Sequence, residues 1–104
     1  MSFRYYVILD SQEPDRPRGL FTFNEGDGRY DFVGWDHLDK RWEDTPSLVD
    51  YVYGERSDLA AEISRARAEE TAAQLGVPLP SQDELVEIAN ERERERQRGR
   101  VSGN

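Results

Sequence analysis

LFTFN at Leu20–Asn24 and RYDFVGW at Arg29–Trp35 flank the tetrapeptide EGDG at residues 25–28. Both flanking segments are rich in aromatic and β-branched residues, which favour strands. Glycines on both sides of Asp27 permit the positive φ angles that tight hairpins need. The sequence therefore predicts an antiparallel hairpin, beside which further strands can pair. The short GDG segment resembles a phosphate loop only weakly, because a strand and not a helix follows it.

Two further strands are predicted on either side of this hairpin. FRYYVIL at Phe3–Leu9 is apolar on both of its faces, which indicates a strand covered on both sides and near the centre of the sheet. Residues 11–19 contain two prolines and a glycine and are expected to form an irregular surface loop. A short fourth strand is possible at Lys40–Trp42.

Helices are predicted in the second half of the chain. Thr45 followed by Pro46 is typical of a helix start, and Gly54 of its end, so a short helix is expected at about 46–53. A second helix is expected at about 58–75, with Ser57 or Ser64 as its cap, since a thin apolar and alanine-rich stripe recurs at helical spacing.

The C-terminal quarter divides into three parts. Residues 77–81 form an extended spacer, and Ser81 with Glu84 is a capping box that opens a charged helix over 82–98. From Glu91 to Arg98 no apolar residue is available to dock, so this helix should project, at least in part. The tail 99–104 is expected to be disordered.

Together these patterns predict an α+β fold. It consists of a small antiparallel sheet of three or four strands with two packed helices, forming a body over residues 1–76. The longer C-terminal helix projects from it.

The amino-acid composition excludes several kinds of site and segment. The 104 residues include no cysteine, which excludes disulfides and thiolate metal sites. We expect no signal peptide, because Asp10 follows the first apolar segment at once, and no apolar run approaches the roughly 20 residues of a membrane span. A cytoplasmic protein is predicted, or one of the host cytoplasm if a phage encodes it.

Charge disfavours nucleic acid as a partner. The net charge is -8, and residues 1–60 carry thirteen acidic against seven basic residues. Such a surface repels phosphates and favours basic or apolar partners. Only Lys40 among the fourteen basic residues is a lysine, which is typical of a GC-rich genome.

No residue set predicts catalysis. His37, the one histidine, lies between Asp36 and Leu38, but no nucleophile motif accompanies it, and one histidine with scattered aspartates is a weak metal set. We therefore predict that the protein is not an enzyme and has no metal or cofactor.

Partner binding has better candidates. All eleven aromatic residues fall within the first 53 positions, and those left over after core packing can anchor a protein. The Glu/Arg run at 91–98 can be a solvated helix end or an arm ordered by a partner. The candidate partner-binding residues are Trp35, Trp42, Tyr51, Arg94, Arg96 and Arg98.

A resemblance rests on the order of several short motifs. YYVI at 5–8, the glycine-bearing hairpin, RWED at 41–44, PSLVDY at 46–51 with Gly54, and EIS at 62–64 stand in sequence. This order resembles a group of short uncharacterised proteins of actinobacteria and their phages, over residues 3–75. The resemblance implies no known activity, and no catalytic residue is carried over from it.

Three functional hypotheses follow from these observations. The first is a small acidic, non-enzymatic protein-interaction module, such as a phage or bacterial accessory protein that binds and modulates a cellular protein. The second is a self-assembling structural component that forms homo-oligomers through its C-terminal helix. The third is a DNA mimic that occupies the DNA-binding site of another protein.

Overall fold

A computed structural model describes residues 2–26 and 28–102 of the chain. In the described residues, five antiparallel strands form one sheet in the order β4-β3-β2-β1-β5, so β2 lies at its centre and β1 is internal. The predicted α+β class and antiparallel sheet are confirmed. The strands are β1 (Arg4–Leu9), β2 (Pro17–Gly26), β3 (Arg29–Asp36), β4 (Arg41–Asp44) and β5 (Ala60–Ile63).

The predicted hairpin joins β2 to β3. Its last pairs are Glu25 with Tyr30 and Gly26 with Arg29, and Gly28 adopts a φ of 72°, which is the left-handed region that favours glycine. The strands are longer than predicted, because β2 begins at Pro17, inside the segment expected to be an irregular loop. Pairing with β1 extends β2, because the two strands pair as far as Leu9 of β1 and Pro17 of β2.

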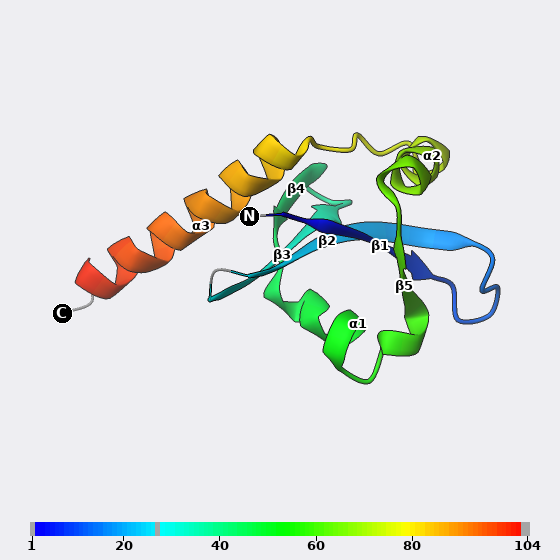
Figure 1. Ribbon diagram of the computed structural model, residues 1–104, viewed down its shortest axis with the longest axis horizontal. Coiled ribbons are helices and arrows are strands. Elements are labelled where there is room, and N and C mark those ends of the chain that lie inside the picture. The colour runs from blue at the N-terminus through cyan, green and yellow to red at the C-terminus, as the bar shows by residue number, and fades with distance from the viewer. Residues whose placement is uncertain (1, 27, 103–104) are drawn as a thin grey trace.

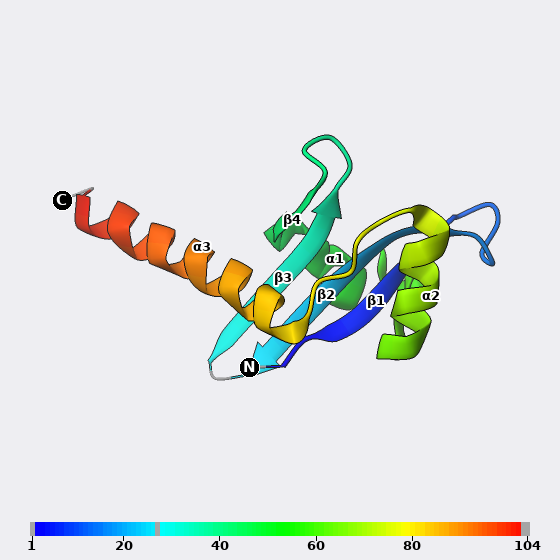
Figure 2. The same cartoon turned by 90° about the horizontal axis from the view of Figure 1, so that it is seen from above.

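Helices cover the sheet on both sides (Figure 1). A 3-10 turn (Pro46–Val49) and α1 (Asp50–Tyr53) lie on one side, which we call the α1 face. On the other side, the α2/α3 face, lie α2 (Arg65–Leu75) and the long α3 (Gln82–Ser102). The turns at the C-terminal end of α3 extend past the sheet (Figure 2), as the sequence predicted for part of this helix.

The α1 face has an aromatic core. Phe21, Phe23 and Phe32 are buried, and the rings of Phe23 and Phe32 stack with centroids 4.5 Å apart. Leu48 approaches β3 so closely that a Cβ on Gly34 would lie 2.8 Å from its Cδ1 atom. Glycine at position 34 therefore lets the 3-10 turn pack against the sheet.

The α2/α3 face is more mixed. The two helices bury Ala68 and Leu85 against Phe3, which precedes β1, and against the strand residues Tyr5 and Val33. Polar side chains are buried on the same face, among them Asn24 and Asp31, at 2% exposure each. This face thus combines apolar packing with internal polar contacts.

The predicted helix at 58–75 is wrong in its first part. Residues 57–59 form a 3-10 turn and Ala60–Ile63 form β5, which pairs with Tyr5–Ile8 of β1. Backbone pairing with the open edge of β1 overrides the helical spacing of these residues. The sheet consequently has five strands where three or four were predicted, and the helix begins only after Ser64, one of its two predicted caps.

Helix ends agree with the prediction in part. Gly76 ends α2 in the left-handed conformation, and Ser81 and Glu84 form the predicted capping box. Thr45, by contrast, makes no capping bond, because its hydroxyl donates to the carbonyl oxygen of Glu43. α3 continues to Ser102, four residues beyond the predicted end at 98. The helix therefore includes part of the tail that was expected to be disordered. Residues 103–104 of that tail lie outside the described residues.

Within the described chain, no helix combines the length and apolarity that a membrane crossing requires.

Candidate functional site

The first turns of α3 are fixed to the sheet by buried apolar residues and by one glutamine. Leu85 and Ala89 are buried, at 0% and 1% exposure. The Gln82 side chain accepts from the Phe3 N–H at 2.9 Å and donates to the Phe3 carbonyl at 3.0 Å. These two bonds pair Gln82 with the backbone of Phe3 much as a neighbouring strand would, and so set where α3 begins.

Arg29 of β3 holds the middle of α3. Its guanidinium donates to the Ala89 carbonyl at 3.2 Å and to the Asn90 side chain at 3.0 Å. The same group pairs with the buried carboxylate of Asp31 at 3.0 Å. Asp31 also accepts from Asn24 at 3.0 Å, so the carboxylate has partners on two sides.

Asp44 of β4 holds the next turns. Its side chain, 7% exposed, pairs with Arg96 at 3.0 Å and with Arg92 at 3.7 Å. Burial raises the pKa of Asp44 above its ordinary value, while the two guanidiniums oppose that shift. The sequence predicted no docking after Asn90, but these ion pairs keep α3 attached as far as Arg96.

A groove lies between β4 and α3. It has a volume of about 670 Å³, and its described lining comes only from these two elements, so it opens along the side of β4 that faces away from β3. The lining comprises all four residues of β4 and, from α3, Glu84, Glu87, Ile88, Glu91, Arg92 and Glu95.

Carboxylates dominate this groove. Six of its lining residues are acidic and two, Arg41 and Arg92, are basic. Two arginines outside the lining compensate part of this charge, since Arg94 reaches Glu87 at 3.1 Å and Glu91 at 2.7 Å, and Arg98 reaches Glu91 at 3.7 Å. These pairs are about half exposed, and exposed pairs contribute little free energy, so the carboxylates can exchange them for a stronger cationic partner.

Trp42 gives the groove an apolar element. The indole is half-buried, packs with the core of the α2/α3 face, and donates from Nε1 to the Pro78 carbonyl at 2.6 Å. The ring of Trp35 lies 6.2 Å from it. The bond to Pro78 fixes the indole, so that its remaining surface is a rigid contact for a ligand in the groove.

The six sequence-predicted partner residues do not form one surface. Trp35 and Trp42 lie together at the β4 end of the sheet, whereas Tyr51 packs on Phe21 on the α1 face. Arg94 and Arg98 are exposed on α3 and pair with Glu91. Arg96 faces Asp44 and serves the attachment of α3.

Sequence reasoning did not single out the glutamates of α3 that line the groove. Residues 84, 87, 91 and 95 are spaced by three or four, which places them on one side of a helix. That spacing is visible in the sequence, but only the position of β4 shows that this side faces a strand.

A second surface feature is an exposed pair of tyrosines on the α1 face. Tyr30 and Tyr53, 63% and 58% exposed, both contact the buried ring of Phe23. The Tyr53 hydroxyl donates to Glu25 at 2.9 Å, and this bond is the main reason that the pKa of Tyr53 is raised. These rings continue the aromatic core to the surface.

Three carboxylates meet at the β3–β4 turn. One oxygen each of Asp36, Asp39 and Glu43 lies within 4.8 Å of the others, a set that could hold a cation such as Ca²⁺. Asp36 accepts from the backbone of Leu38 at 2.8 Å. The interaction between Asp36 and Glu43 is the first cause of a lowered pKa at Asp36 and a raised pKa at Glu43. Exposed His37 lies in the same turn.

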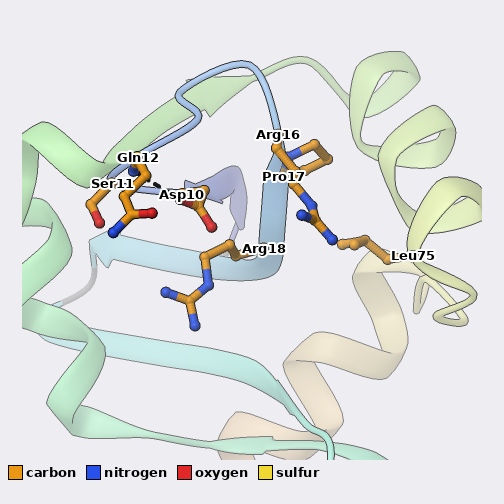
Figure 3. A pocket seen from close by; sticks show the side chains of 7 residues that line it. All are labelled: Asp10, Ser11, Gln12, Arg16, Pro17, Arg18 and Leu75. Atoms are coloured by element: carbon orange, nitrogen blue, oxygen red, sulfur yellow. Dashed lines mark hydrogen bonds between the residues drawn. The ribbon is translucent and has the colours of Figure 1, made fainter.

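The β1–β2 loop forms another hollow, of about 540 Å³ (Figure 3). Asp10, Ser11 and Gln12 lie on one side of it, and Arg16, Pro17 and Leu75 on the other. Asp10 is used locally, because it accepts from the Gln12 N–H at 2.8 Å, and this bond is the main cause of its lowered pKa. With only a half-buried leucine as apolar lining beside Pro17, this hollow offers less to a ligand than the groove beside β4.

No protein-family model, curated protein or solved structure matches this chain. The resemblance to short actinobacterial and phage proteins therefore stays a prediction, and the groove and its neighbouring surfaces are the basis for assigning a function.

Proposed function

We propose that this protein is a non-enzymatic protein-interaction module that takes a basic segment of another protein into the groove between β4 and α3. The observation that carries the proposal is the groove itself, in which six carboxylates surround the indole of Trp42 and the side chain of Ile88. In this proposal the module modulates its partner by occupying that segment.

Lysine and arginine match both parts of the lining. Their methylene stems can lie along an indole while their charged ends reach carboxylates beyond it. Trp42 and the glutamates at 87 and 91 provide these two elements in one groove. Tryptophan held rigidly in a partly buried position is also a common source of binding free energy at interfaces.

The alternatives find less support in the groove. A nucleic acid would place phosphates against an excess of carboxylates, which repel them. A DNA mimic needs rows of uncompensated negative charge, whereas α3 interleaves Arg92, Arg94 and Arg96 with its glutamates. A second copy of this chain shares the net charge of -8, so self-association through this groove is opposed by repulsion.

Peptide binding tests the proposal. The probe is a labelled hexapeptide of alternating lysine and threonine, and its counterpart of alternating glutamate and threonine serves as the negative peptide. We expect the lysine peptide alone to bind, with NMR shift changes confined to β4 and α3. Shift changes that spread over the whole surface, or that centre on Tyr30 and Tyr53, would refute the groove as the site.

Matched variants separate the groove from general electrostatics. Replacing Glu87 and Glu91 by glutamine should weaken binding of the lysine peptide about tenfold, because two lost exposed charge contacts at about 0.7 kcal/mol each total about 1.4 kcal/mol. The control replaces both Glu69 and Glu70 by glutamine, which removes the same charge from two exposed helical glutamates on α2, outside the groove. Equal weakening by this control would mean that only net charge matters.

A further inference from the structure

The geometry points to strand addition: we propose that the basic segment binds as an extended sixth strand, antiparallel to β4, with every second side chain directed at α3. This inference rests on the proposed function and specifies the conformation and the sequence pattern of the partner.

The outer side of β4 offers unpaired backbone groups. Because the Thr45 N–H donates to the Phe32 carbonyl at 2.8 Å, position 45 faces β3. Backbone direction alternates along an antiparallel strand, so Trp42 and Asp44 present their N–H and C=O groups away from β3. β4 is the last strand of the described sheet on this side, and such an edge is a template for another strand.

α3 leaves this backbone uncovered. In the described chain, its polar contacts with β4 run through side chains, from Arg92 and Arg96 to Asp44. Those contacts lie on the α2/α3 face, while the groove continues along the edge past all four β4 residues. A strand placed in the groove would therefore meet the β4 backbone on one side and the side chains of α3 on the other.

The side-chain pattern of the partner follows from the pleat. Trp42 and Asp44 point to the α2/α3 face, and residues directly opposite them in an added strand point the same way. These partner residues would meet the side of α3 that lines the groove, where four glutamates outnumber Arg92, so they should be lysine or arginine. The residues between them would lie beside Arg41 and Glu43, which already pair with one another at 3.3 Å, and need no charge.

Lengths agree with this arrangement. Four strand residues span about 13 Å at about 3.3 Å each. From Glu84 to Glu95 the helix rises about 16 Å, at about 1.5 Å per residue. Lysines at alternate positions of one short strand are about 7 Å apart, so their long side chains can reach glutamates on successive turns of α3. A helical partner would satisfy the charges but not the backbone groups of β4, and an isolated short helix is marginal in water.

In this arrangement the charges on β4 determine which strands can pair with it. Natural edge strands are often short and charged, which prevents unspecific pairing. Arg41 and Glu43 give β4 that protection, and the glutamates of α3 extend it to any strand without basic residues. The charges of β4 and α3 that oppose pairing of β4 with a second copy of this chain thus also favour a basic strand.

Backbone methylation of the probe tests strand addition. Two versions of the lysine–threonine hexapeptide are compared. In the first, the backbone nitrogen of every lysine is methylated. In the second, the backbone nitrogen of every threonine is methylated. In an antiparallel addition the lysine N–H groups face β4, so methylating them should weaken binding at least about tenfold, while methylating the threonines should change it less than about threefold. Loss confined to the threonine peptide would support strand addition in the parallel direction and overturn the antiparallel one.

Two outcomes separate the failure of this inference from the failure of the proposed function. If both methylated peptides bind like the parent, a basic segment occupies the groove without strand pairing, and the inference is wrong while the proposed function stands. If the unmethylated peptide does not bind, the proposed function itself fails.

Amide hydrogen exchange supplies a second measurement on the full chain. On saturation with the unmethylated peptide, exchange at the N–H groups of Trp42 and Asp44 should slow by about tenfold or more, because these groups gain partners. Exchange at Glu43, whose N–H already faces β3, should change little. Unchanged exchange at both Trp42 and Asp44 in the saturated protein would overturn the inference.

Discussion

On the α1 face, β2 and β3 bring Phe23 and Phe32 together as a stacked pair, whereas the next residues along each strand, Asn24 and Asp31, form a hydrogen-bonded polar pair on the opposite face. The α1 face is closed by aromatic packing. Beyond Ala89, the α2/α3 face is closed by charges, with Arg29 and Asp44 binding α3 from two strands. Apolar burial supplies most of the free energy of folding, while the polar contacts determine where α3 lies, and with it the groove.

The largest effect should come from the aromatic side of this comparison. Phe23→Ala removes a ring that is 1% exposed and contacts several other rings. We expect the free energy of unfolding in urea to fall by about 3–5 kcal/mol, from lost burial and the cavity left behind. Leu38→Ala is the control, because this side chain is 92% exposed and its loss should change stability by less than about 0.5 kcal/mol. A loss below about 1 kcal/mol at Phe23 would mean that the α1 face is not a packed core.

A slightly smaller loss is expected at the charged attachment. Arg29→Ala leaves the buried Asp31 carboxylate with only its Asn24 partner, and should cost about 3 kcal/mol. It should also speed amide exchange in α3 around Asn90, since that part of the helix loses two hydrogen bonds to Arg29. Adding Asp31→Asn to this variant should recover part of the stability, because it removes the uncompensated charge and keeps an acceptor for Asn24. No recovery would mean that the contacts of Arg29 with α3 account for the whole loss.

The aromatic half of the comparison could be predicted from the sequence, because aromatic residues that alternate on both sides of a glycine turn are typical of a hairpin with one buried face. The charged half could not. Arg29 and Asp31 alternate with Tyr30 and Phe32, which is the pattern of a strand with one solvated face. Only the return of α3 over that face shows that Arg29 and Asp31 have partners there.

The candidate site was predictable to a similar extent. Trp42 could be chosen from its residue type alone, since tryptophan is a common anchor at protein interfaces. The groove depends on β4 being an edge and on which side of α3 faces it, and both are set by long-range contacts. β5 was missed for the same reason, because residues 60–63 become a strand only beside β1.

Gly34→Ala tests how tightly the α1 face is closed. Its new Cβ would lie 2.8 Å from the Cδ1 atom of Leu48, the end of a flexible side chain that can move in part. We expect a loss of about 1 kcal/mol in the free energy of unfolding, at the low end of the cost of overpacking. Gly26→Ala is the matched control, because a Cβ there meets nothing within 4 Å. Equal effects of the two changes would show that the closeness of Leu48 is not what matters at position 34.

The smallest effect concerns the pH dependence of Asp44. Because burial raises its pKa above 3.8, the folded protein binds more protons at this group than the unfolded chain does, over the acid range just above that pH. The contribution of Asp44 to stability should therefore fall as the pH rises through this range. Asp44→Asn removes this titration while leaving the other carboxylates in place, so the stability of wild type minus that of the variant should decrease from low to neutral pH in urea unfolding. An increase over the same range would mean that Arg92 and Arg96 outweigh burial and that these ion pairs stabilise the attachment of α3 outright, as aromatic packing stabilises the α1 face.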